Sequence, residues 1–290
     1  MEGGSIYRSE AAREAIERVY DQARDRLTFP TESRMVETRF GPTHLLVAGP
    51  PDGRPIVALQ GGNVVNPLTL AWLAPLAGEF RIYAPDTIGQ PGRSAGRRVS
   101  ANDASLGEWA LDVLDALELR SASFIGASYG AGVFLRLAAI APDRIDRGVI
   151  VVPAGLTEVP LGSMLSLAAG YLGYRFIGRR GLVEATVRSL AGPTPDALMV
   201  ESTALAFRGT QLDTDMPRLA TADELRGLTA PIMVFAGERD PLFPPDRVLP
   251  KARQVFAHLV AAETLPGCAH ILDAACAAAL CDRIRPFLGE

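Results

Sequence analysis

The sequence contains no apolar run long enough to cross a lipid bilayer, so it predicts no membrane span. Its first 27 residues are charged throughout and lack the apolar core of a secretory signal, so we expect no export of the chain. The net charge is −4 and the arginines are spread along the chain, which gives no support for a nucleic-acid surface. The sequence therefore predicts a cytoplasmic protein with no nucleic-acid partner, and it leaves the oligomeric state open.

Cysteine is scarce. The three cysteines, Cys268, Cys276 and Cys281, all lie near the C-terminus. An odd, clustered set is a poor disulfide framework, and without a paired Cys-x-x-Cys or a histidine cluster it is also a poor metal site. We therefore expect three small buried side chains in a reducing compartment, and no metal or cofactor.

The composition is that of an ordinary globular protein. Of the 290 residues, 48% are hydrophobic and 21% are charged, a balance that allows a substantial core. This length suits one large domain, or one domain with a small insertion.

Short apolar segments alternate with helical patterns along most of the chain. Segments 34–40 and 43–49 predict a hairpin with Gly41-Pro42 as its turn. Near-continuous apolar strands separated by helices are typical of a parallel sheet covered on both faces. We therefore predict an α/β fold with a mostly parallel central sheet of about eight strands, an antiparallel edge, and a leading helix over about 8–27. The further strands are expected at 55–61, 80–86, 122–128, 148–154, 231–240 and, more weakly, 259–267.

One segment, 156–223, interrupts this alternation. It contains no convincing strand but several helical patterns, including 163–178. It is long for a crossover, so we interpret it as a helical cap over the carboxyl ends of the strands, inserted into a core of 1–155 and 224–290. Its apolar stretch 161–174 is too short to span a membrane, and we expect it to pack over the core.

The stretch GASYG, residues 126–130, lies where a predicted strand ends and a helical pattern, 129–141, begins. It matches Gly-x-Ser-x-Gly, in which a sharp strand-to-helix turn raises a serine hydroxyl above the edge of the sheet. Small residues two positions before and after the serine avoid a steric clash in such a turn. The pattern also occurs by chance, and a serine that only caps a helix is the alternative. The strand before it and the helix after it favour Ser128 as a nucleophile.

A serine nucleophile needs a base, and the sequence has three histidines. His44 lies inside a predicted strand and His258 at the end of a helical pattern, so both are interpreted as structural. His270 lies in a glycine-containing loop after the last predicted strand, a position at which α/β sheets collect reactive groups. We therefore favour His270 as the base.

Two acidic residues at the end of strand 231–240 are candidates for orienting that histidine. Asp240 precedes Pro241, which cannot continue a central strand, so the chain turns there and directs the carboxylate across the strand ends. Glu238 lies two residues earlier and is the alternative. A second alternative is that Asp240 only caps the next helix. We favour Asp240 as the acid.

With Ser128, Asp240 and His270 in that order, the chain resembles the α/β-hydrolase superfamily over nearly all of its length. The resemblance implies a serine hydrolase, carboxylesterase-like, with a Ser-His-Asp triad, no cofactor or metal, and a small-molecule ester as substrate. Relatives that open epoxides or displace halide carry aspartate at the elbow, which Ser128 argues against. Acyl transfer, thioester, lactone or carbon–carbon bond hydrolysis and peroxide chemistry stay open on the same triad.

The same resemblance implies an oxyanion hole formed by the backbone N–H groups of Gly62 and Tyr129. At Gln60 the family usually has histidine, a departure that leaves the backbone donor in place. Asn63 could instead supply a side-chain donor. Asp86, in a loop that resembles the family's acidic loop, is interpreted as structural.

We predict that the cap lines the substrate pocket with apolar side chains such as Met164, Leu167 and Tyr171, and we place Asn63 in the same pocket. The alternative is that these side chains only pack the cap against the core. A function of another class also stays open: a ligand-binding protein of this fold with little turnover. Against it, none of the three catalytic groups is lost.

Overall fold

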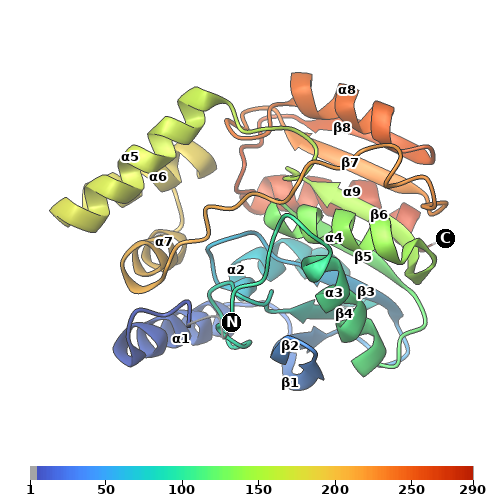
Figure 1. The fold of residues 1–290 in the computed structure, drawn as a ribbon, viewed down its shortest axis with the longest axis horizontal. Coiled ribbons are helices and arrows are strands. Elements are labelled where there is room, and N and C mark those ends of the chain that lie inside the picture. Colours follow the sequence, from blue (N-terminus) through green and yellow to red (C-terminus); the bar gives the residue numbers. More distant parts are fainter. Residues whose placement is uncertain (1–4, 290) are drawn as a thin grey trace.

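The computed structural model describes residues 5–289, and within them eight strands form one sheet in the order β1-β2-β4-β3-β5-β6-β7-β8 (Figure 1). The bounds of these strands are β1 (Thr31–Thr38), β2 (Gly41–Ala48), β3 (Arg54–Leu59), β4 (Phe80–Pro85), β5 (Ala122–Ala127), β6 (Ile145–Val151), β7 (Ile232–Gly237) and β8 (Leu259–Leu265).

The sheet is parallel from β4 to β8, and only the β1–β2 and β2–β4 pairs are antiparallel. This confirms the predicted mostly parallel sheet with an antiparallel edge. The hairpin turn lies two residues earlier than predicted, because Thr38 pairs with Gly41 and leaves Arg39-Phe40 as the turn. Gly41, with φ 112°, uses its conformational freedom to open β2 rather than to form the turn itself.

Helices cover both faces of the sheet, as predicted. The first face carries α1 (Glu10–Asp25), α2 (Asn66–Leu70), the 3₁₀ helix η1 (Ala71–Leu76) and α9 (Ala274–Gly289). The second carries α3 (Ser105–Ala116), α4 (Tyr129–Ile140) and α8 (Pro245–Val255), with the short 3₁₀ helix η2 (Pro142–Arg144) after α4.

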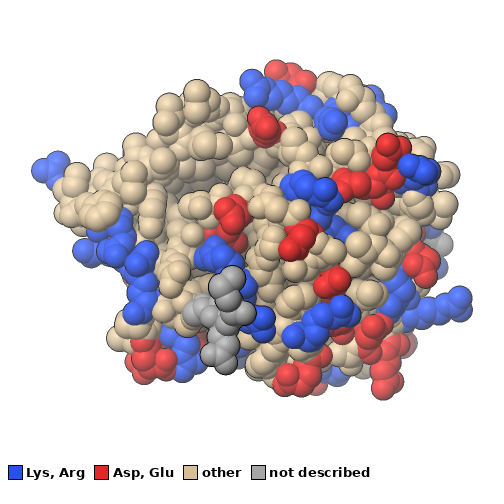
Figure 2. All heavy atoms as spheres, in the orientation of Figure 1, with Lys and Arg blue, Asp and Glu red and all other residues tan. Residues whose placement is uncertain are grey.

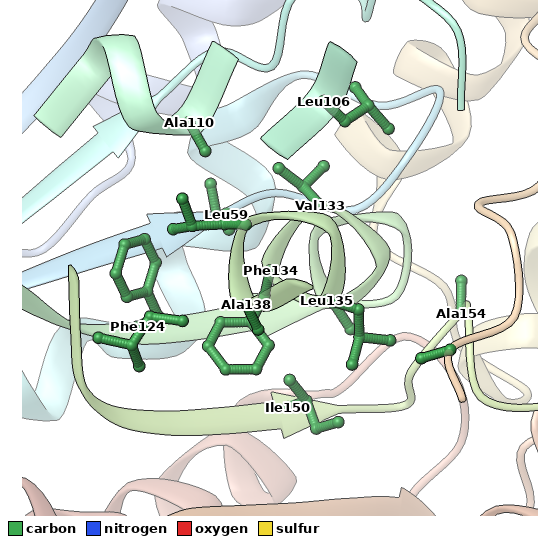
Figure 3. Packing of buried hydrophobic residues seen from close by; sticks show 14 of the residues in the cluster. Leu59, Leu106, Ala110, Phe124, Val133, Phe134, Leu135, Ala138, Ile150 and Ala154 are labelled. Carbon is green, nitrogen blue, oxygen red and sulfur yellow. The ribbon is translucent and has the colours of Figure 1, made fainter. Parts of the chain in front are cut away.

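Side chains of one strand enter the two cores alternately, because successive residues point to opposite faces. In β5, Phe124 enters the core beneath α3 and α4, whereas Ile125 enters the core beneath α1 and α9. Phe124 packs against Phe134 of α4, with ring centroids 5.9 Å apart (Figure 3). Strand β5 is therefore a fully buried central strand, and its carboxyl end is a rigid place for a functional group.

The segment 156–223 contains three helices, α5 (Leu161–Ile177), α6 (Arg180–Ala191) and α7 (Ala197–Gly209). They share a small apolar cluster of their own that includes Val183 and Phe207. The leading helix α1 packs against α7, and a Cβ added at Gly209 would lie 3.0 Å from the Ala12 Cβ. The division into a core and a cap domain at these boundaries stays a prediction.

The stretch 161–174 packs over the core only in part, through Leu167, which packs against the core cluster beneath α4. In α5 only Gly170 is buried, while Leu161, Leu165 and Leu172 are exposed. Figure 1 shows α5 at an outer edge of the molecule, and Figure 2 shows a largely uncharged surface there. Because α5 is apolar on more than one side, its inner side packs against the core, α6 and α7, and its outer side stays exposed. Within residues 5–289, no helix combines the length and apolarity that a membrane span requires.

Candidate active site

Ser128 lies at the turn between β5 and α4 with φ 49° and ψ −112°, a backbone conformation that non-glycine residues rarely adopt. Hydrogen bonds to the segment around the end of β6 hold it there. The Ser128 N–H donates to the Val151 carbonyl at 2.9 Å, and the Ala154 N–H donates to the Ser128 carbonyl at 3.2 Å. Val152, next to this contact, also has a positive φ, of 45°. The surrounding sheet therefore imposes the strained turn.

The two glycines of the elbow are needed because backbone surrounds them. A Cβ at Gly130 would lie 2.2 Å from the Leu59 carbonyl oxygen of β3, far inside any real contact. A Cβ at Gly126 would lie 2.8 Å from the Ala131 Cα of α4. A side chain at either position would force α4 away from the sheet, so the small residues fix where Ser128 is presented.

Three side chains from distant parts of the sequence form one hydrogen-bonded chain. His270 Nε2 lies 3.0 Å from Ser128 Oγ, and His270 Nδ1 lies 2.9 Å from Asp240 Oδ2. Asp240 and His270 are 3% and 8% exposed, so little water competes for the bond between them. If Nδ1 carries the proton and donates it to the carboxylate, Nε2 is left as an acceptor for the serine proton.

Asp240 is oriented by the turn that follows β7. Its Oδ1 accepts the N–H groups of Leu242 at 2.8 Å and Phe243 at 3.1 Å, while Oδ2 accepts from His270. The helix-capping alternative does not describe it, because α8 begins at Pro245 and the residue at its N-cap is Pro244. The carboxylate therefore closes the turn with one oxygen and leaves the other directed at the imidazole.

Glu238, the alternative acid, is hydrogen-bonded to a different partner. Its carboxylate accepts the Gly267 N–H at 2.6 Å at an exposed position. The structure thus brings Ser128, Asp240 and His270 together and leaves Glu238 outside that chain of hydrogen bonds.

The loop after β3 lies against the start of α4. A Cβ at Gly62 would lie 3.2 Å from the Tyr129 Cβ, so the two predicted oxyanion residues are close neighbours. Among residues 5–289, the structure gives neither the Gly62 N–H nor the Tyr129 N–H a hydrogen-bond acceptor, whereas the next amide, that of Asn63, donates to Gln90 Oε1 at 2.7 Å. Both predicted donors are therefore available for a ligand oxygen.

Gln60, at which the sequence departs from the pattern expected of the family, acts within the loop. Its side chain is 1% exposed, donates to the Val64 carbonyl at 2.9 Å and accepts the Thr87 N–H at 3.2 Å. The amide side chain therefore ties the loop to the segment after β4.

Sequence reasoning missed the residues that surround Asn63. The Asn63 side-chain amide is engaged with the backbone of Asp213, through Asn63 Nδ2 to the Asp213 carbonyl at 2.9 Å and the Asp213 N–H to Asn63 Oδ1 at 3.1 Å. Asp213 Oδ2 also accepts from Gln90. No signal in the sequence pointed to Asp213, because it lies in an irregular segment 150 residues from its partner.

The predicted pocket residues of the insertion lie in different surroundings. Met164 is 49% exposed, and Leu167 packs at the edge of the core cluster beneath α4. Tyr171 stacks edge-on against Phe207, with ring centroids 5.3 Å apart, inside the insertion. Whether these side chains contact a substrate stays a prediction.

A cavity of about 420 Å³ is lined by residues of α1, α2 and η1, of the segment after α6, and of 271–277. Leu68, Trp72, Met199 and Ile271 provide its apolar lining. Ser128 and the predicted pocket residues do not line this cavity.

All three cysteines are buried, as expected, but the expectation of no disulfide was wrong. Cys268 and Cys276 form a disulfide across a sequence separation of eight residues, and Cys281 alone is free and buried. Burial raises the pKa of the Cys281 thiol to about 12, which makes it unreactive. A stable disulfide is uncommon in a reducing cytoplasm, so the cytoplasmic location stays a prediction that the redox state of this pair can test.

Within the described residues, no group of His, Cys, Asp and Glu side chains is suited to hold a metal ion.

The other buried histidine belongs to a separate network. His44 Nδ1 lies 3.2 Å from Asp86 Oδ2, and Asp86 also accepts from Tyr20 and Asn66. Asp86 is fully buried and ties α1 and α2 to the sheet, in keeping with the structural role predicted for it.

Known proteins resemble this chain over most of its length. Residues 56–282 match the model of a family described as the alpha/beta hydrolase family. Carboxylesterase YbfK of Bacillus subtilis (strain 168) is 26% identical over 263 residues, which cover 88% of this chain and 86% of that protein. The uncharacterized carboxylesterase nap of the same strain is 26% identical over 253 residues, covering 83% of this chain and 81% of that protein. The crystal structure of naproxen esterase (carboxylesterase NP) from Bacillus subtilis aligns with a TM-score of 0.83 at 21% identity, over 96% of this chain and 99% of that chain.

Proposed function

This chain belongs to the alpha/beta hydrolase family, and from that premise we propose that it cleaves carboxylic esters of small molecules through an acyl-enzyme. Ser128 is the nucleophile, His270 the general base and acid, and Asp240 the residue that orients His270. The observation that carries the proposal is the continuous hydrogen-bonded chain from Ser128 Oγ through His270 to Asp240. The likeness to proteins named as carboxylesterases supports esters as the substrate class.

The first half of the reaction forms the acyl-enzyme. As Ser128 Oγ attacks the ester carbonyl carbon, His270 Nε2 takes the hydroxyl proton and becomes an imidazolium, which the Asp240 carboxylate stabilises through Nδ1. The carbonyl oxygen gains negative charge, which we place between the N–H groups of Gly62 and Tyr129. The Tyr129 N–H is suited to this role because it belongs to the first turn of α4, where amides have no acceptor within the helix.

Collapse of this first intermediate completes the first half: the bond to the alcohol oxygen of the ester breaks, and His270 gives its proton to that oxygen, which departs as the alcohol. In the second half, His270 takes a proton from water as water attacks the acyl carbon of the acyl-enzyme. Collapse of the second intermediate breaks the bond to Ser128 Oγ, releases the acid and returns the proton to the serine. Esters suit this site better than amides, because departure of an alkoxide depends less on protonation by the general acid than departure of an amine does.

We assign the insertion 156–223 the role of a cap that shapes the substrate pocket. Its support is the position of its helices beside the carboxyl end of the sheet (Figure 1), and a hydrogen bond from the Ser163 hydroxyl to the Pro241 carbonyl, one residue from Asp240. The binding of the acyl or alkyl group beneath α5 follows from this assignment.

A panel of p-nitrophenyl esters graded by acyl-chain length tests the proposal. We expect measurable hydrolysis by the parent protein and a loss of about 10⁴-fold or more in kcat for Ser128→Ala, since a triad residue contributes on that order. Ser189→Ala, at an exposed position of α6, is the matched control and should retain full activity.

Labelling with a fluorophosphonate probe separates an enzyme from a ligand-binding protein of the same fold. The parent should be labelled at Ser128 and the Ser128→Ala variant should not. A parent that neither hydrolyses the panel nor reacts with the probe would overturn the proposed function.

A further inference from the structure

Asp213 lies in the irregular segment that leads from α7 back to the core. It contacts Tyr129, one of the two residues assigned to the oxyanion hole, and Asn63, which directly follows the other, Gly62. With its backbone it forms the reciprocal pair of hydrogen bonds with the Asn63 side chain, at 2.9 and 3.1 Å. Asn63 directly follows Gly62, and its φ of 58° is left-handed. Because few residues hold that conformation without support, this amide pair is what fixes the loop at that point.

The Asp213 carboxylate is bonded to three further side chains. Oδ2 accepts from Gln90 Nε2 at 2.9 Å and from the Tyr129 hydroxyl at 3.2 Å, and Oδ1 pairs with Arg98 at 2.7 Å. Gln90 in turn accepts the Asn63 N–H through its Oε1 at 2.7 Å. The contacts form a closed circuit from the loop after β3, through Asp213, to the side chain of Tyr129.

Holding the Asp213 carboxylate in this position costs folding free energy, since its side chain is only 5% exposed. Burial raises the pKa of the Asp213 carboxyl above its usual range, even though Arg98 acts in the opposite direction. A buried ion pair of this kind adds little net folding stability relative to an apolar pair, so stability alone does not account for it. Two of the residues that contact Asp213 adjoin the proposed reacting groups: Tyr129 directly follows Ser128, and Asn63 directly follows Gly62.

We propose that Asp213 is a positioning residue for the oxyanion hole: it holds the loop after β3 and the start of α4 at the separation at which the Gly62 and Tyr129 amides receive the same oxygen. The inference rests on the proposed function for its catalytic consequence. It also gives one residue of the insertion a positioning role beside the reacting centre, because Asp213 belongs to the segment 156–223.

Asp213→Asn tests the role with the smallest change. Donors from Gln90, Tyr129 and Arg98 approach the two carboxylate oxygens, so an amide must turn its own N–H groups toward one of them. We expect kcat for a p-nitrophenyl ester to fall about 10- to 100-fold, because removing one oxyanion donor outright costs about 100-fold or more and here the donor is displaced. KM should stay within about threefold, because the lost interaction is made mainly in the transition state.

Asp215→Asn is the matched control. Asp215 is an exposed carboxylate two residues along the same segment, and only its backbone N–H contacts Asp213. Its kcat and KM should equal those of the parent. The melting temperature of Asp213→Asn should fall, because Arg98 loses its ion-pair partner, so kcat is compared at a temperature below the melting transition of every variant. A residue with a merely structural role would lower the melting temperature and leave the kcat of the folded protein unchanged.

Hydrogen exchange read by mass spectrometry gives a measurement that needs no esterase activity. Asp213→Asn should speed exchange in peptides that cover residues 60–64 and 128–131, and Asp215→Asn should not. Asn63→Gly is the second variant, because glycine keeps the left-handed φ while removing the amide pair. Asn63→Gly should show the same faster exchange and the same loss in kcat. It therefore still tests the proposal if Asp213→Asn fails to fold.

The outcomes separate the two proposals. Unchanged exchange and unchanged kcat in Asp213→Asn and Asn63→Gly would overturn the positioning role and leave the esterase proposal intact. A parent protein without esterase activity would overturn the proposed function, and the exchange data would still decide whether Asp213 fixes the loop.

Discussion

Asp240 and Glu238 lie two residues apart beyond the end of β7, yet their carboxylates point to different partners. Asp240 Oδ2 is 2.9 Å from His270 Nδ1, whereas the Glu238 carboxylate accepts the Gly267 N–H at 2.6 Å. The chain turns between them, with the Asp240 N–H donating to the Gly237 carbonyl at 3.1 Å. This turn decides which of two similar acidic residues can orient the histidine.

Asp240→Asn should therefore lower kcat strongly, by up to about 10⁴-fold, because an amide in this position favours the wrong imidazole tautomer. Glu238→Gln, which removes a charge of the same sign two residues away, should change kcat by less than about threefold, since its carboxylate touches no reacting group. Steady-state kinetics with one p-nitrophenyl ester decide the matter. If Glu238→Gln is the impaired variant, the acid has been misassigned.

Gly130→Ala should prevent the elbow from forming. The added Cβ would meet the Leu59 carbonyl oxygen at 2.2 Å, and neither group can move without displacing β3 or α4. Gly162→Ala is the control, because an added Cβ there meets nothing within 4 Å and alanine favours a helix over glycine by about 0.5–1 kcal/mol. Thermal unfolding should show a much lower melting temperature or no folded protein for the first variant, and an equal or higher melting temperature for the second.

Leu167→Ala and Met164→Ala should shift the preferred acyl-chain length of the ester panel, because we place both side chains along the substrate pocket. Leu165→Ala provides the comparison, since Leu165 is 61% exposed on the outer side of α5. An unaltered preference in both pocket variants, with kcat intact, would mean that these side chains serve only to pack the insertion against the core.

Reduction of the Cys268–Cys276 disulfide should lower both stability and activity. The bridge closes a short loop that contains His270, and a loop of that size is worth about 2–3 kcal/mol in the chain-entropy model. We expect a phosphine reductant to lower the melting temperature and kcat of the parent, and to have no further effect on Cys276→Ala. Thiol trapping of protein taken directly from its source cells checks whether the bridge is present there. Three free thiols would support the cytoplasmic location and count against a structural role for the bridge.

The parts of the site that depend on local chain geometry could be predicted from the sequence. Glycine on either side of Ser128 and proline directly after Asp240 mark turns whose steric requirements are legible in a few residues. The alternation of apolar strands and helices likewise predicted a sheet that is parallel from β4 to β8.

The parts that depend on distant contacts could not be predicted. Asp213 acts through residues up to 150 positions away, and nothing in its own neighbourhood marks it. The Cys268–Cys276 bridge was missed because counting cysteines cannot show that two of them face one another. The exposed outer face of α5 was missed because the apolar pattern of a helix does not show which surface, if any, each of its sides packs against.

The conformation of Ser128 has a consequence for how such a protein responds to selection. A non-glycine residue held at φ 49° and ψ −112° costs on the order of 1–3 kcal/mol of folding free energy, and glycine at that position costs far less. A library of variants sorted only for resistance to heat should therefore enrich glycine at position 128, and every clone that carries it would have lost its nucleophile. Selection for heat resistance therefore favours glycine at this position, whereas selection for turnover favours serine.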